Sequence, residues 1–334
     1  MIVRPSLLAL GPLAFGLATF GALDSVAIAQ PVNESAMPAK PAGAIGTPTG
    51  TGRYPAIAEA RAEAPQYTFY RPSRMPGKRL PLVLWGNGGC RDNGLSASHF
   101  LREVASHGYV MVANGAPRFE RPAVTVLPAA SGLTASPAGR PTAPPRNTPD
   151  ETQTSQLLAA IKWAQAENAD RTSPYFRHIN ISRIAVMGHS CGGLQALAAG
   201  TDPRIDAVVA FDSGVYIRAN SGLSGVLIYK DDLRKLHTPV AYFIGGPGDI
   251  AYPNANDDVA RIDHIPVFYA NLPVGHGGTF PLVNGGEWAR FGTAWLDWQL
   301  KRDRRAARWF TGARCGLCTT RGWTIVRKNF PENP

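Results

Sequence analysis

A serine set between glycines is the first feature of this sequence that could carry out chemistry. Ser190 lies in Gly188-His189-Ser190-Cys191-Gly192, after the apolar run "SRIAVM" and at the start of the helical pattern "GGLQALAAG". A G-x-S-x-G stretch between a strand and a helix is typical of a nucleophilic serine, because the glycines permit the tight turn that lifts the hydroxyl above the sheet. A Gly-rich turn that only packs a helix closely on a strand explains the glycines, but not the serine at the apex.

A serine nucleophile needs a histidine base, and the base needs a carboxylate that orients it. Asp249 follows the apolar run "PVAYFIGG" and so lies at the carboxyl end of a predicted strand, the edge where open α/β sheets hold their active sites. Asp212 follows "AVVAF" in the same way and is the alternative acid. We favour Asp249, and we expect Asp257, Asp258 and Asp263, which occur in polar sequence, to be surface charges.

His276 is the candidate base. It follows the predicted strand "IPVFYA" on the glycine-rich loop "NLPVGHGGTF", whereas His264 precedes that strand and is expected at its opposite end. The other histidines have no such placement, and we expect ordinary surface or packing roles for His99, His107, His178, His189 and His237.

The tetrahedral intermediate of acyl transfer needs hydrogen-bond donors, usually the N–H after the nucleophile and one from a loop after an earlier strand. The first is the N–H of Cys191, and the loop is "VLWGNGGCRDN". There we expect the N–H of Asn87 to be the second donor, with that of Gly88 as its alternative. An ordinary turn is the other interpretation of the glycines in this loop.

Strand and helix patterns alternate from Arg53 onward, which predicts an α/β fold with a doubly wound, mostly parallel sheet flanked by helices. The predicted strands are residues 66–72, 80–87, 108–116, 182–189, 207–213, 239–246 and 265–273, and the predicted helices are residues 98–108, 152–168, 192–200 and 287–303. In the last helix, four aromatic residues share one face and are expected to pack on the sheet: Trp288, Phe291, Trp295 and Trp298.

Four motifs, "WGNGGC", "GHSCGG", "GGPGD" and "VGHGG", occur in this order, and together they resemble the α/β-hydrolase superfamily over about residues 65–300. The nearest likeness is to its dienelactone-hydrolase-like, chlorophyllase-like and cutinase-like polyester hydrolase branches. The resemblance implies Ser190 as nucleophile, His276 as base and Asp249 as the residue that orients it. Dienelactone hydrolases proper have a cysteine at the nucleophile position, so their lactone substrate is not carried over.

The resemblance implies a serine hydrolase that cleaves carboxylic esters through an acyl-enzyme on Ser190, without a metal or organic cofactor. A polyester or cutin-type hydrolase and a lipase are the alternatives, and the substrate is a small-molecule or polymeric ester. The same groups could cleave amides or thioesters. A hypothesis of another class is a non-catalytic ligand-binding protein that keeps the hydrolase fold and has a broken triad. We expect a monomer.

Four cysteines in an exported chain suggest two disulfides. Cys315 and Cys318 form a C-x-x-C pair that we interpret as a local structural disulfide, rather than a redox pair or half of a zinc site. If the oxyanion loop faces the nucleophile turn, Cys90 and Cys191 come within bonding reach. We therefore predict a second disulfide, Cys90–Cys191, with two buried unpaired thiols as the alternative.

The beginning of the 334-residue chain has the layout of a signal peptide: a basic start, an interrupted apolar stretch and small residues before Gln30. We expect residues 1–29 to be cleaved rather than kept as a membrane anchor, and no later stretch is long enough to span a bilayer. Residues 30–52 are expected to form a flexible Pro/Gly-rich leader. Residues 53–334 then form one catalytic domain with a disulfide-containing tail, secreted or periplasmic.

The net charge of +10 is concentrated in the C-terminal tail. No nucleic-acid-binding motif accompanies it, so we expect no nucleic-acid partner and interpret the tail as a basic face that favours anionic surfaces or substrates. Residues 117–150 are rich in Pro, Ala, Arg and Thr and follow a predicted strand. A loop of this length is functional or poorly ordered, and we expect it to overhang the site.

Overall fold

A computed structural model describes residues 43–118, 151–217 and 225–330. The predicted signal peptide and nearly all of the 117–150 loop lie outside the described residues. Everything below concerns the compact unit that begins at Met37.

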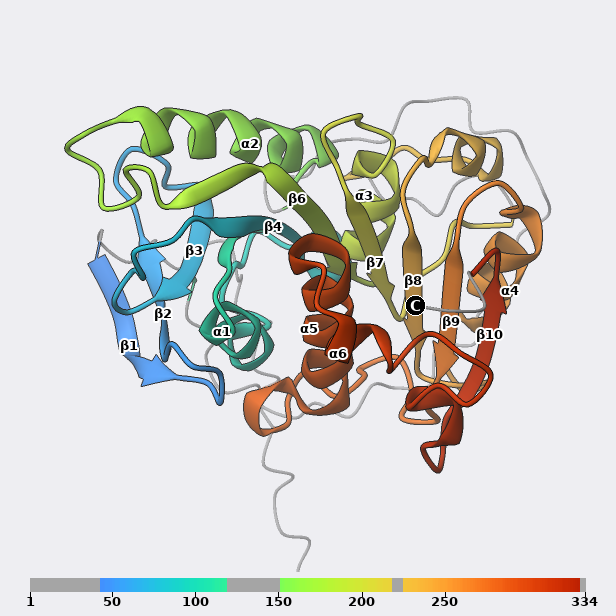
Figure 1. Ribbon diagram of the computed structural model, residues 1–334. Helices are drawn as coiled ribbons and strands as arrows, with labels where there is room; N and C mark the ends of the chain where they lie inside the picture. The colour runs from blue at the N-terminus through green and yellow to red at the C-terminus, as the bar shows by residue number, and fades with distance from the viewer. Residues whose placement is uncertain (1–42, 119–150, 218–224, 331–334) are drawn as a thin grey trace, which may run out of the picture. The chain divides into compact units, whose positions relative to one another are not determined.

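A ten-stranded sheet, in the order β1-β2-β3-β5-β4-β6-β7-β8-β9-β10, forms the centre of this unit (Figure 1). The six central strands are parallel: β5 (Val110–Asn114), β4 (Leu80–Gly86), β6 (Ile179–His189), β7 (Ala207–Phe211), β8 (Val240–Ile244) and β9 (Val267–Asn271). The flanking strands are antiparallel: β1 (Gly43–Thr49), β2 (Ala56–Ala60), β3 (Tyr67–Pro72) and β10 (Thr324–Lys328). The predicted α/β fold is confirmed.

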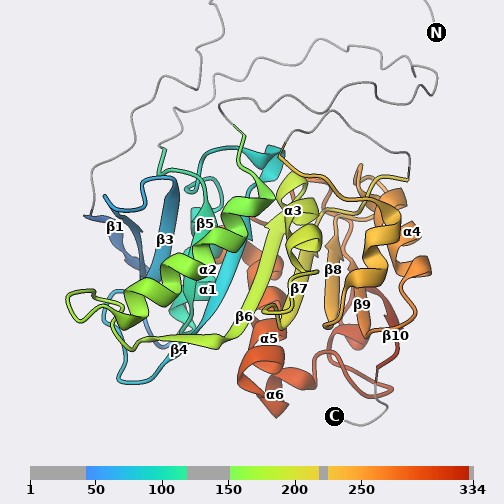
Figure 2. The same cartoon turned by 90° about the horizontal axis from the view of Figure 1, so that it is seen from above.

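Helices cover both faces of the sheet (Figures 1 and 2). One face packs against α2 (Thr154–Ala169), α3 (Cys191–Ala199) and α4 (Tyr252–Arg261), and the other packs against α1 (Ser98–Ser106), α5 (Gly286–Lys301) and α6 (Arg304–Ala307). Short 3-10 helices lie between them: η2 (Gly88–Cys90), η3 (Lys230–Lys235), η4 (Val283–Gly285) and η5 (Leu317–Thr319).

The apolar runs of the central strands follow from burial on both faces. In β6, Ile184 and Val186 enter the core under α2 and α3, whereas Ala185 and Met187 enter the core under α1 and α5. Because successive side chains of a strand point to opposite faces, a strand with two covered faces must be apolar throughout. The parallel pairing of β6 with β4 and β7 places Ser190, which follows β6, at the carboxyl edge of the sheet.

The leader prediction needs a correction, because residues 43–49 form β1, which pairs with β2. This edge strand has one buried apolar side chain, Ile45, and is held through its backbone. The Arg102 guanidinium of α1 donates to the carbonyls of Ile45 (2.5 Å) and Thr47 (3.0 Å). Because hydrogen bonds to its backbone hold β1, rather than buried side chains, its sequence shows no apolar periodicity.

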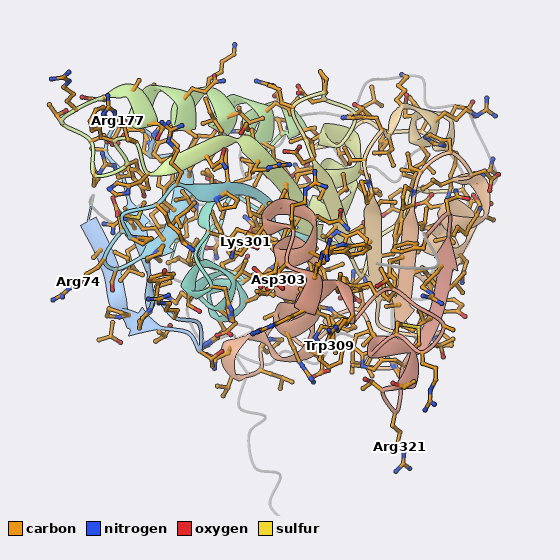
Figure 3. All side chains as sticks on the ribbon, in the orientation of Figure 1. Arg74, Arg177, Lys301, Asp303, Trp309 and Arg321 are labelled. Atoms are coloured by element: carbon orange, nitrogen blue, oxygen red, sulfur yellow. A yellow bond between two sulfur atoms is a disulfide. The ribbon has the colours of Figure 1, made fainter. Side chains whose placement is uncertain are left out.

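The C-terminal part contains the aromatic helix face that the sequence predicts. It also contains a strand that the sequence pattern did not predict. Trp288, Phe291 and Trp295 are fully buried in α5, as predicted. Beyond α6, β10 joins the edge of the sheet beside β9. Parts of the basic tail are structural, since Lys328 binds Asp263 (2.5 Å), while Arg321 points away from the protein (Figure 3). None of the helices in the described ranges is long and apolar enough to cross a membrane.

Candidate active site

The turn between β6 and α3 holds Ser190 in a strained backbone conformation, with φ 52° and ψ −119°. A positive φ is unfavourable for a residue with a side chain and is found where surrounding structure enforces it. A Cβ added to Gly188 would lie 2.0 Å from the carbonyl oxygen of Gly192, and one added to Gly192 would lie 2.0 Å from the backbone of Gly86. The glycines thus allow β4, β6 and α3 to approach closely beneath the serine.

The structure brings the three predicted catalytic residues together. The Oγ of Ser190 lies 2.8 Å from Nε2 of His276, and Nδ1 of His276 lies 2.6 Å from Oδ1 of Asp249. The three residues come from the turn after β6, the loop after β8 and the loop after β9, all at the carboxyl edge of the sheet. In this arrangement an imidazole can take a proton from the serine hydroxyl while the carboxylate orients the ring and stabilises the imidazolium.

Asp249 is buried and ionised. Burial raises the pKa of its carboxyl group, but hydrogen bonds from His276, from the N–H of Ala251 (2.8 Å) and from the N–H of Gly245 (3.1 Å) outweigh burial, so the net pKa is lowered. An ionised carboxylate at Nδ1 requires a proton on that nitrogen, which leaves Nε2 free to accept the serine proton.

A cavity of about 360 Å³ opens beside Ser190 and His276. Its walls include Trp85, Gly88, Gly89, Arg91, Phe280 and Pro281. Gly88 therefore faces the cavity, as does Ser190. The N–H of Cys191 is the first of helix α3 and has no partner within the helix.

The side chain of Asn87 holds the oxyanion loop in place. It is fully buried, accepts a hydrogen bond from Trp85 Nε1 (2.9 Å), and donates to the carbonyls of Arg91 (3.0 Å) and Asn114. This role was not predicted from the sequence, because Asn114 comes from a neighbouring strand.

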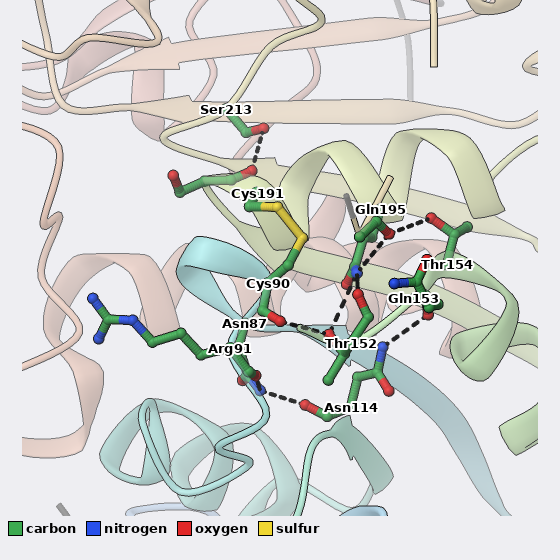
Figure 4. The surroundings of a disulfide bond; sticks show 12 residues. Asn87, Cys90, Arg91, Asn114, Thr152, Gln153, Thr154, Cys191, Gln195 and Ser213 are labelled. Carbon is green, nitrogen blue, oxygen red and sulfur yellow. Dashed lines mark hydrogen bonds between the residues drawn. A yellow bond between two sulfur atoms is a disulfide. The ribbon is translucent and has the colours of Figure 1, made fainter. Parts of the chain in front are cut away.

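Both predicted disulfides are present in the structure. Cys90, at the end of η2, is bonded to Cys191, with 5.2 Å between their Cα atoms, and Cys315 is bonded to Cys318. Figure 4 shows the surroundings of the first bond: Thr152 donates to the Cys90 carbonyl (2.7 Å), and Gln195 of α3 donates to the Thr152 carbonyl (2.8 Å). The loop after β4 is thus tied to α3 by one covalent bond and a chain of hydrogen bonds.

His189 has a positioning role that the sequence did not predict. Its Nε2 lies 2.8 Å from the carbonyl oxygen of His276, and burial lowers its pKa to about 4. A neutral ring must therefore donate from Nε2, and this hydrogen bond ties the turn of Ser190 to the loop of His276. The position of His189, beside the nucleophile, was the one available signal.

Asp258 corrects a second expectation, because it is fully buried rather than a surface charge. It accepts hydrogen bonds from Lys230 Nζ (2.6 Å) and the N–H of Val215 (2.8 Å). Ala255, Asp258 and Val259 lie on the buried face of α4. The helical spacing of the two apolar residues was a signal that this aspartate faces inward.

Two comparisons with known proteins bear on this site. The model of a PET hydrolase-like family, PETase, matches residues 142–215, a segment that holds Ser190 but neither Asp249 nor His276. The chain resembles the polyester hydrolases of the α/β-hydrolase superfamily. A curated relative, hydrolase ffsE of Aspergillus flavipes, is 30% identical over 142 residues, or 42% of this chain. That match spans only 27% of the relative's length.

The comparisons support an ester hydrolase. Within residues 43–118, 151–217 and 225–330, no group of three His, Cys, Asp or Glu side chains is placed to hold a metal ion.

Proposed function

We propose that this protein is a serine hydrolase of carboxylic esters. The observation that carries the proposal is the unbroken chain from Ser190 Oγ through His276 (2.8 Å) to Asp249 (2.6 Å). A ligand-binding protein that had lost catalysis would have no need to keep these three groups aligned or a serine with a strained backbone.

In the first half of the reaction, Ser190 attacks the acyl carbon while His276 accepts its proton at Nε2. Negative charge develops on the acyl oxygen, and we expect the N–H groups of Cys191 and Gly88 to stabilise it. We prefer Gly88 to Asn87 as the loop donor because Gly88 lines the cavity. His276 then protonates the leaving alcohol, and the acyl group stays on Ser190 as an ester.

In the second half, a water molecule attacks the acyl-enzyme and gives a proton to His276. The same donors stabilise the second tetrahedral intermediate, and its collapse releases the acid and returns the proton to Ser190. Asp249 remains ionised throughout and stabilises the imidazolium that forms in each half.

A polyester or another large apolar ester is the substrate class that we favour. The PET hydrolase-like match supports it. Ile250, which directly follows Asp249 in sequence, is an exposed apolar side chain and also supports it. Exposed apolar groups near a site are typical of surfaces that bind apolar partners. The two disulfides support a secreted or periplasmic protein, because such bonds persist in oxidising compartments.

Labelling with a fluorophosphonate tests the nucleophile. The wild-type protein should be modified at Ser190, and Ser190→Ala should neither react nor hydrolyse 4-nitrophenyl esters. Ser182→Ala is the matched control, since Ser182 is exposed and bonds only to neighbouring Asn180. A wild-type protein inert to the label and to esters of every chain length would favour the binding-protein hypothesis. Acid release from polyester particles separates the substrate classes.

A further inference from the structure

The end of β7 carries a second buried aspartate that the triad does not use. Asp212 is fully buried, and its Oδ2 accepts a hydrogen bond from Trp288 Nε1 (2.9 Å). Its other oxygen, Oδ1, is buried and receives no hydrogen bond from the described residues. A buried carboxylate oxygen without a donor is costly, so this atom needs an explanation.

No counter-charge accompanies Asp212. Among the described residues, neither a lysine nor an arginine lies within 4.0 Å of its carboxyl group, and the one basic neighbour is His189, 3.8 Å away. That ring already donates to the His276 carbonyl and is neutral, because burial lowers its pKa to about 4. The adjoining core is aromatic, with Phe211 and Phe243 packed on Trp288.

Asp212 follows β7 and Asp249, the acid of the triad, follows the neighbouring strand β8, and Asp249 raises the pKa of the buried Asp212 carboxyl group, which points to a hydrogen bond between the two carboxyl groups. Two carboxyl groups in contact can form such a bond only if one of them carries a proton. Asp249 accepts from His276 and two backbone N–H groups, so it is the ionised member. Burial, together with the charge of Asp249, raises the pKa of Asp212 to about 9.

We propose that Asp212 is a neutral carboxylic acid that donates a hydrogen bond to Asp249 and so positions the acid of the triad. The proton belongs on Oδ1, because Oδ2 already accepts from Trp288. This inference rests on the proposed function. Asp212 is a positioning residue, since it acts through Asp249 and does not line the substrate cavity.

The Asp212–Trp288 pair also supports the loop of the catalytic base. A Cβ added to Gly278, two residues after His276, would lie 2.0 Å from Trp288 Nε1 and 2.6 Å from Asp212 Oδ2. The loop therefore rests directly on this hydrogen bond. One pair of side chains thus aligns both Asp249 and His276.

Two substitutions of Asp212 test the proposal through kinetics. Asp212→Ala removes the hydrogen bond and should lower kcat on a 4-nitrophenyl ester by about 100-fold with little change in KM, because the triad loses its alignment. Asp212→Asn keeps a donor toward Asp249 and an acceptor for Trp288, so it should recover most of that loss. An Asp212→Asn protein that folds yet is as slow as Asp212→Ala would overturn the proposal.

The alkaline limb of the pH profile tests the proton itself. In the wild type, ionisation of Asp212 near pH 9 places a second negative charge beside Asp249, so kcat should fall there. In Asp212→Asn this fall should be absent. A purely structural Asp212 would leave both profiles alike, and that result would contradict the proposal.

Thermal unfolding tests the same proton without any enzymatic assay. The pKa of Asp212 is raised on folding, so its stabilising effect is complete below the unfolded value and is lost as pH rises toward about 9. The Tm of Asp212→Asn minus that of the wild type should therefore increase between about pH 4 and about pH 9. A constant difference would overturn the proposal.

An infrared band of a protonated carboxylic acid at neutral pH, lost in Asp212→Asn, is the matching spectroscopic signature, and its absence from the wild type would count against the proposal. The unfolding and infrared measurements hold even for a protein that hydrolyses no ester. Failure of the proposed function is therefore distinguishable from failure of this inference.

Discussion

Asp249 and Asp212 follow neighbouring strands and are both buried, yet their surroundings favour the ionised form of Asp249 and the neutral form of Asp212. Asp249 receives hydrogen bonds from an imidazole and two backbone N–H groups, which hold its pKa below the ordinary value. Asp212 receives a hydrogen bond from the indole of Trp288, but burial outweighs it and raises the pKa of Asp212 to about 9. The number of donors thus decides which aspartate can orient the base.

Asp249→Asn tests this assignment at the level of one residue. The amide cannot serve as the charged acceptor for Nδ1 of His276, so the ring loses its required tautomer, and kcat should fall by about 10⁴-fold, as for the corresponding change in serine proteases. Steady-state hydrolysis of 4-nitrophenyl acetate measures it. Asp231→Asn, at an exposed position in η3, is the control and should leave kcat unchanged. Near-normal activity of Asp249→Asn would transfer the role of acid to Asp212.

At the level of elements, the nucleophile depends on the close approach of β4, β6 and α3. Gly86, Gly188 and Gly192 meet where these elements converge, with no space for a Cβ atom. The strain at Ser190 is sustained by this packing and by the hydrogen bond from Ser213 Oγ to the Ser190 carbonyl (2.7 Å).

Gly188→Ala should therefore destabilise the protein by about 3 kcal/mol, because its methyl group would meet the backbone of Gly192 and force β6 and α3 apart. Urea unfolding followed by circular dichroism measures the free energy of unfolding. Gly77→Ala is the control, since a Cβ there meets nothing within 4 Å. A variant as stable as the control would show that the turn relaxes at little cost.

The sequence predicted those elements that can be recognised from the pattern of their own side chains. The central parallel strands are apolar throughout, and the turn at Ser190 is marked by its glycines. The edge strands β1 and β10 were missed because backbone pairing, rather than an apolar pattern, holds them. Asp258 was misjudged, and the contacts of Asp212 were not predicted, because their partners, Lys230 and Trp288, are 28 and 76 residues away in sequence. Local patterns carry no information about such pairs.

For the whole molecule, the Cys90–Cys191 disulfide is the longest covalent constraint, with a sequence separation of 101 between its cysteines. It joins the loop after β4 to the start of α3, and so connects the two elements that supply the proposed oxyanion donors. The Cys315–Cys318 bond has a sequence separation of 3 and constrains only a local turn of the tail.

Removal of the first disulfide should therefore cost much more stability than removal of the second. In the chain-entropy model, a link that closes a loop of about 100 residues contributes about 4 to 5 kcal/mol. Cys90→Ser with Cys191→Ser should lose a free energy of that order in urea unfolding and should also lower kcat, since the donors are no longer fixed. Cys315→Ser with Cys318→Ser is the matched control. Equal losses from both pairs would contradict this view.

The position of this disulfide also bears on how the protein matures. A newly made chain presents a free thiol on each side of the site until both halves have been synthesised and an oxidant has joined them. We therefore expect hydrolytic activity to require an oxidising environment in which this disulfide can form.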